Sequence, residues 1–291
     1  MATRPVPSPV SALTARKTWR TVEPLHGMVY FAPEAEQAYA ELGLADRSGY
    51  FASRSAPMGA VDAGTVVATF FNFAPPLVHR SMAGVWERTT PTAVLAARTA
   101  AAGAALRRML GDAADSDDVT AAADLARRAA LAATGHPEGR PLFAGHAGLE
   151  WPDRPLEVLW HAQTLLREFR GDAHVALLLA HGIDGLEALV LHEATAELPI
   201  AFLRATRGWT DAEWTAAAER LVARGWLRPG ATAEHLALSD EGAAVRRSIE
   251  EATDRLSVAA YAAIGEDGCD MLRGLVRPLS RTVVAASGMG G

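Results

Sequence analysis

The sequence predicts a mainly α-helical protein, in which an N-terminal helical domain precedes a C-terminal domain that adds one short hairpin to its helices. Three observations support this prediction. The 291 residues suit two domains of ordinary size, and 49% hydrophobic with 21% charged residues is typical of globular chains. Alanine-rich segments follow helical spacing, and no region is rich in strand-forming residues. We expect a mobile arm over 1–20, the first domain over 21–155 and the second over 156–291.

The first part of the chain contains the expected arm and two short helices. Three prolines between positions 5 and 9, without apolar periodicity, favour the arm. Pro33 suits the first turn of a helix that runs through Glu34–Leu42, and Asp62 suits the N-cap of a helix that ends before Pro75. The intervening residues 49–59 are expected to form a loop.

A series of helices then follows to residue 194. Proline and acidic residues separate them: the acidic stretch 112–118 predicts a turn, and the prolines of 135–155 predict an extended connector. Gly171 is expected to interrupt the polar and apolar helix that begins at Leu156. The predicted helices are 77–86, 91–110, 119–133, 156–169, 173–181 and 186–194.

The segment 196–256 predicts a winged helix. A short helix, a turn and a second helix capped by Thr210 precede a two-stranded wing, and a long helix follows the wing. Pro229-Gly230 would form the tip of the wing. The expected elements are helices 198–205, 211–224 and 243–263 and strands 226–227 and 235–238.

Two stretches of this segment resemble the MarR-like winged-helix family. "ERLVARGWLRP" (219–229) resembles the second helix leading into the wing, and "LALSDEGAAVRRSIE" (236–250) resembles the return strand and the start of the dimer helix. The resemblance implies a small-molecule-responsive transcriptional regulator that dimerises through Ala243–Ala263 and Leu272–Val284.

The longer chain also resembles an actinobacterial two-domain family labelled helix-turn-helix, whose activity is uncertain. The stretches that suggest it are "YFASRSAPMG", "ATFFNFAPPLV" and "LWHAQTLLREFRGDAH".

The charge of the winged-helix segment leaves its role open. From Pro199 to Arg247, seven arginines oppose six acids, a net of +1, and the second helix has three acids against two arginines, a net of −1. DNA affinity rests largely on phosphate neutralisation, so a DNA-binding surface would need every suitable arginine. The candidates are Arg204, Arg207, Arg220 and Arg228. The alternative is a winged helix used for packing or ligand binding.

A polar cluster precedes the winged helix and is a candidate ligand site. Arginine forks bind carboxylate or phosphate, and histidine beside a carboxylate transfers protons near neutral pH. Interhelical salt bridges are the structural alternative. The candidate residues are His161, Arg167, Arg170, Asp172 and His174.

The aromatic N-terminal region is a second candidate. Its aromatic residues predict either an aromatic core or a pocket for a planar or apolar small molecule, in which Arg54 and Asn72 would be the orienting polar groups. The aromatic residues are Tyr30, Phe31, Tyr50, Phe51, Phe70, Phe71 and Phe73.

The cysteine content of the sequence disfavours disulfide-bonded proteins and proteins with cysteine-bound metals. The single cysteine, Cys269, allows neither an intramolecular disulfide nor a cysteine-based metal centre within one chain. We predict no metal, no cofactor, no membrane span and a cytoplasmic homodimer.

The leading functional hypothesis is the small-molecule-responsive regulator with DNA as a partner. The alternative is an enzyme or ligand-sequestering protein of specialised metabolism that does not bind DNA.

Overall fold

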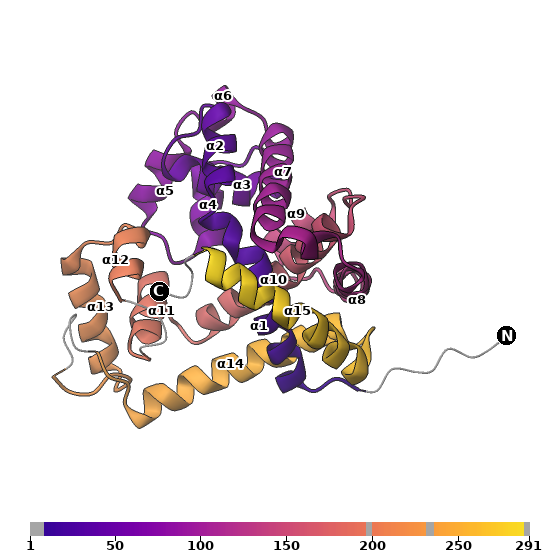
Figure 1. Ribbon diagram of the computed structural model, residues 1–291. Helices are drawn as coiled ribbons and strands as arrows, with labels where there is room; N and C mark the ends of the chain where they lie inside the picture. Colours follow the sequence, from indigo (N-terminus) through magenta and orange to yellow (C-terminus); the bar gives the residue numbers. More distant parts are fainter. Residues whose placement is uncertain (1–8, 196–199, 231–235, 288–291) are drawn as a thin grey trace. The chain divides into compact units, whose positions relative to one another are not determined.

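The computed structural model describes residues 9–195, 200–230 and 236–287, and it confirms a mainly α-helical protein (Figure 1). The chain divides into two compact units, and each of them combines separate stretches of sequence. Unit 1 comprises residues 1–61, 84–173 and 254–291, and unit 2 comprises residues 62–83 and 174–253. This division differs from the contiguous domains expected from the sequence: the chain passes between the units four times, and two of these crossings lie inside long helices.

Unit 1 is built from helices at the start, middle and end of the chain. Two helices, α10 (Pro155–Ala180) and α14 (Asp240–Tyr261), have residues in both units. The elements that lie entirely in unit 1 are α1 (Ala12–Gly27), η1 (Met28–Tyr30), α2 (Pro33–Glu41), α3 (Arg47–Ser55), η2 (Ala56–Met58), α6 (Val85–Arg88), α7 (Pro91–Leu110), η3 (Gly111–Asp115), α8 (Asp117–Ala133), α9 (Pro141–Ala147) and α15 (Gly265–Ser287).

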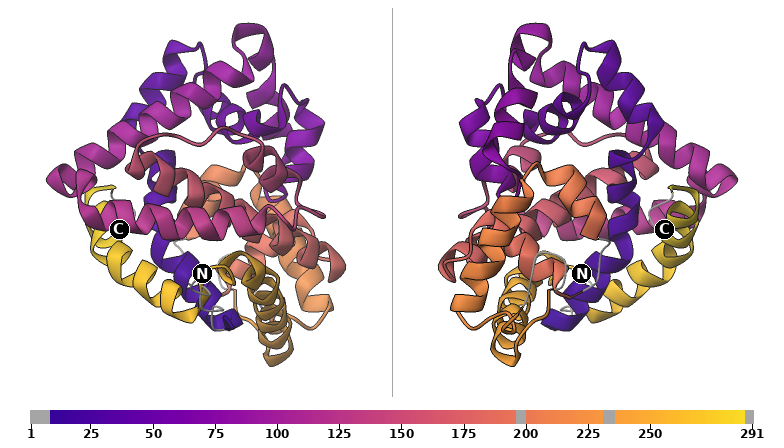
Figure 2. Two further views of the ribbon diagram at one scale, coloured as in Figure 1. Left: turned by 90° about the vertical axis from the view of Figure 1, so that its right-hand side faces the viewer. Right: turned by 90° about the vertical axis from the view of Figure 1, so that its left-hand side faces the viewer.

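Helix α1 begins inside the segment that was expected to be a mobile arm. Ser11 caps it by accepting a hydrogen bond from the backbone N–H of Thr14 at 3.0 Å. The helix lies beside α15, as both views of Figure 2 show, and the Ser280 hydroxyl donates to the carbonyl of Thr21 at 2.7 Å. The expectation of an arm was wrong for residues 12–20 because a tertiary partner 259 residues away stabilises the helix. Residues 1–8 lie outside the described part.

Three further expectations for unit 1 were wrong. The predicted loop 49–59 contains most of α3, and the predicted extended connector 135–155 contains α9. Both helices bury apolar side chains that short windows of sequence do not reveal, such as Phe51 and Phe143. Gly171 does not interrupt α10, because a single glycine costs a buried helix only about 1 kcal/mol and the flanking apolar residues remain packed.

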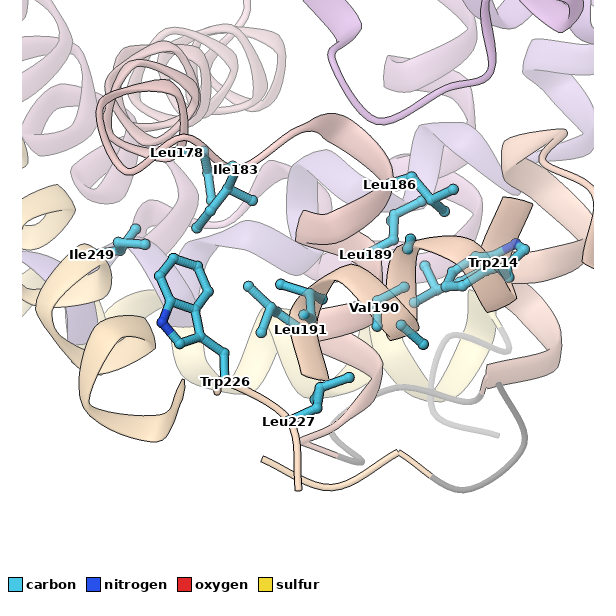
Figure 3. Close-up of a cluster of buried hydrophobic side chains, with 14 residues drawn as sticks. Leu178, Ile183, Leu186, Leu189, Val190, Leu191, Trp214, Trp226, Leu227 and Ile249 are labelled. Carbon is cyan, nitrogen blue, oxygen red and sulfur yellow. The ribbon is translucent and has the colours of Figure 1, made fainter. Parts of the chain in front are cut away.

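Unit 2 contains α4 (Ala63–Phe70), α5 (Pro75–Met82), α11 (Gly185–Glu193), α12 (Ile200–Arg207) and α13 (Asp211–Ala223), with the adjoining parts of α10 and α14. Its core joins α11 to α13 and to the segment after α13, as Figure 3 shows for Val190, Trp214 and Trp226. Trp214 has an exposed fraction of 1%, which fixes one face of α13 towards the core.

The segment that was expected to form the wing contains a single antiparallel bridge in its described residues, Leu227 with Leu238. Beside it, Ser239 accepts a hydrogen bond from the Gly242 N–H at 3.0 Å at the start of α14. A Cβ atom at Gly242 would overlap the carbonyl oxygen of Trp226, so this position requires glycine. Residues 231–235, which include part of the second predicted strand, lie outside the described residues.

Within the described ranges, no single helix is long and apolar enough to cross a membrane. The bent pair formed by α10 and α11 meets that test of length and composition when the two are taken together.

Candidate functional site

A buried polar cluster occupies the interior of unit 1, and five helices and a 3₁₀ turn contribute to it. Helix α10 provides one face of the cluster, because its residues Trp160, Thr164 and Arg167 are spaced four and three residues apart. The other contributing elements are α1, η1, α3, α7 and α9. We call this set the arginine–histidine cluster: Glu23, His26, Tyr30, Tyr50, Arg54, Arg98, His146, Trp160, His161, Thr164, Arg167 and Glu168.

Two arginines of the cluster are paired with carboxylates. Arg54 lies 3.3 Å from Glu168 and donates to the Tyr50 hydroxyl at 2.9 Å. Arg167 is hydrogen-bonded to Glu23 and lies 3.6 Å from Glu168. Burial raises the pKa of Glu23, and the neighbouring Arg167 guanidinium offsets this only in part.

His26 is held at the centre of the cluster by two hydroxyl groups. Its Nδ1 lies 2.9 Å from the Thr164 hydroxyl, its Nε2 lies 2.9 Å from the Tyr30 hydroxyl, and its ring stacks on Trp160. Burial, followed by the charge of Arg167, lowers the pKa of His26 well below its usual value. His26 is therefore a neutral imidazole at pH 7.

Arg98 differs from the other two arginines because its guanidinium has no carboxylate partner among the described residues. Its exposed fraction is 2%. Nη1 donates to the Ser53 carbonyl at 2.9 Å, and the guanidinium lies 5.4 Å from the centre of the Trp160 ring. Within the described residues, Nε and Nη2 have no hydrogen-bond acceptor. A buried cation in this state is costly, since several kcal/mol of desolvation is not repaid.

Two further histidines of the cluster, His146 and His161, have ring nitrogens that make no hydrogen bond to the described residues. Both ring nitrogens of His146 and the Nε2 of His161 have no partner there. Burial, followed by the charge of Arg98, lowers the pKa of His146 well below its usual value and that of His161 to about 4. At pH 7 each neutral ring offers one donor and one acceptor.

Close backbone packing places His146 in the cluster. A Cβ atom at the preceding Gly145 would lie 2.8 Å from the carbonyl oxygen of Pro57, so only glycine lets α9 approach η2 this closely. The cluster thus has three arginines, two carboxylates and three neutral histidines, and it carries an excess of positive charge centred on Arg98.

The other polar residues predicted on α10 lie outside the arginine–histidine cluster. Arg170 donates to Asp254 of α14 at 2.8 Å and lies over the Trp19 ring, which matches the interhelical salt bridge that the sequence left as an alternative. Asp172 accepts from the Phe143 N–H at 2.9 Å, and burial raises its pKa to about 6.

Two of the predicted ligand-binding residues belong to unit 2. The Nδ1 atom of His174 lies 3.0 Å from the hydroxyl oxygen of Thr253. Asn72 provides its backbone carbonyl to the indole N–H of Trp209 at 3.0 Å. The residues predicted to bind a ligand are therefore divided: Arg54, His161 and Arg167 share the cluster, whereas Arg170, Asp172, His174 and Asn72 make structural contacts. A ligand role for the second group stays a prediction.

Three of the four arginines predicted to bind DNA are engaged within unit 2. Arg220 donates to Asp184 and Glu187, each at 2.8 Å. Arg204 lies 3.4 Å from Glu193 and covers the Trp214 ring. Arg207 covers the ring of Phe73 at 4.7 Å.

Arg228 is exposed, as Arg220 also is. The Nε of Arg228 donates to the Leu238 carbonyl at 3.0 Å. Three carboxylates of α13 are also exposed: Asp211, Glu213 and Glu219.

Sequence reasoning did not identify His26, Arg98 or His146. One signal was available for Arg98, since it lies on the buried stripe of α7, four residues after Val94 and three before Ala101. A lone arginine on an apolar stripe marks either a buried ion pair or a site. Among the described residues, no group of three His, Cys, Asp or Glu side chains could hold a metal ion.

Comparison with known proteins identifies a family and no individual relative. A family model described as a helix-turn-helix family matches residues 15–290, which is nearly the whole chain. No curated protein and no solved structure matches the chain significantly. Because the match extends through both units, the chain belongs to this helix-turn-helix family.

Proposed function

We propose that this member of the helix-turn-helix family is a small-molecule-binding protein in which the helix-turn-helix serves as a packing element rather than as a reader of DNA bases. The observation that carries the proposal is the state of the arginines in unit 2. Arg204 and Arg220 are paired with carboxylates, and Arg207 is stacked on an aromatic ring. Each would have to exchange these contacts for phosphate.

The surface of α13 supports the same conclusion. In the MarR-like family that the sequence resembles, this helix would enter the major groove, where base readout uses arginine, lysine or amide side chains. Here its exposed residues include Asp211, Glu213 and Glu219. Carboxylates on this surface repel DNA phosphates and disfavour the approach of α13 to DNA.

The turn between α12 and α13 is itself packed against another segment of unit 2. Trp209 donates to the Asn72 carbonyl at 3.0 Å, and a Cβ atom at Gly208 would lie 2.8 Å from Leu77. Residues 72–77 therefore cover the turn that precedes the second helix. This arrangement favours a packing role for the helix-turn-helix.

The second candidate function is the regulator, and membership in a helix-turn-helix family favours it. The two candidates differ in DNA binding. Fluorescence anisotropy with a labelled duplex from the region upstream of the gene, at low and moderate salt, separates them. We expect only weak binding that falls steeply with salt and does not depend on sequence.

A scrambled duplex of equal length and base composition is the control. Sequence-dependent binding at moderate salt, lost in Arg220→Ala and Arg228→Ala, would overturn the proposal and establish the regulator.

A further inference from the structure

We infer that the arginine–histidine cluster of unit 1 binds a small organic carboxylate, and that the Nε and Nη2 atoms of Arg98 anchor it. This inference rests on the proposed small-molecule function and names the ligand class and the anchoring residue. The starting observation is a guanidinium that is buried to 2% exposure, with two donor atoms that have no acceptor among the described residues.

The identity of the two atoms points to a carboxylate. Nε and Nη2 lie on the same edge of a guanidinium, and their N–H bonds are parallel, as a bidentate carboxylate requires. The remaining nitrogen, Nη1, is held by the Ser53 carbonyl at 2.9 Å, and the ring of Trp160 lies against the guanidinium. These two contacts fix the plane of the fork before any ligand binds.

The neighbouring histidines specify the rest of the ligand. His146 and His161 have exposed fractions of 3% and 5%, and three of their ring nitrogens lack partners among the described residues. Neutral imidazoles match a hydroxyl or carbonyl group. The rings of Trp160 and Tyr30 pack against His26, and the Tyr50 ring packs against Tyr30, so the surroundings of the site are aromatic and match a planar body. The ligand class is therefore a planar monocarboxylate with a neutral hydrogen-bonding substituent.

The charge balance of the cluster favours a single negative charge. Arg54 and Arg167 are already paired with Glu168 and Glu23, which leaves Arg98 as the cation without a carboxylate. One carboxylate neutralises it, whereas a dianion would leave an uncompensated negative charge in the same buried site.

The test measures binding of benzoate, acetate and phenylacetate to the full chain by isothermal titration calorimetry, with benzamide as the neutral counterpart of benzoate. We expect benzoate to bind at millimolar concentration or below and benzamide to bind at least 10-fold more weakly. Arg98→Met should abolish benzoate binding. Arg98→Lys should weaken it at least 10-fold, since it keeps the charge and loses the fork. Arg108→Met is the matched control: its partner Glu34 lies on the surface of the same unit, so benzoate binding should be unchanged.

Several outcomes would overturn the inference. They are equal binding of benzoate and benzamide, wild-type affinity in Arg98→Met, no binding of any of the three carboxylates, or full competition by chloride that indicates an inorganic anion only. None of these concerns DNA. Sequence-dependent DNA binding would overturn the proposed function and leave the carboxylate site in place, whereas benzoate binding that does not depend on Arg98 would overturn this inference alone.

Discussion

Two arginines of α7 should respond to the same substitution in opposite directions. Arg98 is buried without a carboxylate partner among the described residues, whereas Arg107 lies 2.6 Å from Glu157, which is itself buried. The methionine side chain has nearly the reach of the arginine side chain that it replaces, and it carries no charge. Arg98→Met should therefore raise stability in the absence of added carboxylate, and Arg107→Met should lower it.

The magnitudes follow from the contacts that each side chain makes. Arg98→Met removes a hydrogen bond to Ser53 and a cation–π contact with Trp160, which together contribute about 2 kcal/mol. It also removes the desolvation cost of a buried cation, several kcal/mol, so we expect a net gain of about 1–3 kcal/mol. Arg107→Met leaves the Glu157 carboxylate buried without its partner and should cost about 3 kcal/mol.

Urea unfolding of the extensively dialysed full chain, followed by circular dichroism, measures both effects. The expected result is a higher midpoint for Arg98→Met and a lower midpoint for Arg107→Met, with unchanged slopes. A loss of stability in Arg98→Met comparable to that in Arg107→Met would mean that the folded protein itself compensates the Arg98 charge, and Arg98 would then not be an unpaired cation.

Three further predictions concern the rest of the chain. Gly242→Ala should destabilise by more than 2 kcal/mol, because its Cβ atom would overlap the Trp226 carbonyl, whereas Gly274→Ala, with open space around it, should stabilise by up to about 1 kcal/mol; thermal unfolding of the pair checks both. The unfolded chain protonates His161 near pH 6.5 and the folded chain only near pH 4, so this residue should lower stability by up to about 3 kcal/mol as the pH falls from 7 to 4. His161→Phe should flatten this loss in urea titrations; Asp172→Asn should steepen it, because the pKa of Asp172 is raised to about 6 and its protonation favours the folded state. Arg170→Ala should cost about 2 kcal/mol without changing benzoate affinity, and a large loss of affinity in the folded variant would instead return Arg170 to the ligand site.

Local patterns in the sequence were sufficient to predict much of the helical fold. The predicted helix 91–110 has the bounds of α7, and Asp62 and Thr210 cap α4 and α13 as expected. These features depend on residues within a few positions of one another. The helical parts of the expected arm and connector depend instead on tertiary contacts such as that between Ser280 and Thr21, which no short window contains.

The candidate site could be predicted only in part for the same reason. Polar residues that lie close together in the sequence of α10, such as His161 and Arg167, were recognisable as a group. Their partners His26, Arg98 and His146 come from three other helices, and each is a lone polar residue in its own segment. The separation of Arg167, in the cluster, from Arg170, paired with Asp254, depends on where α1 and α14 pack against α10.

Mass spectrometry of the full chain purified under native conditions tests the central claim most directly. Denaturation should release a small organic acid from the wild-type protein and none from Arg98→Met, and Arg108→Met should behave as wild type. Release of the same acid from wild type and Arg98→Met would contradict the assignment of the buried arginine–histidine cluster as the ligand site.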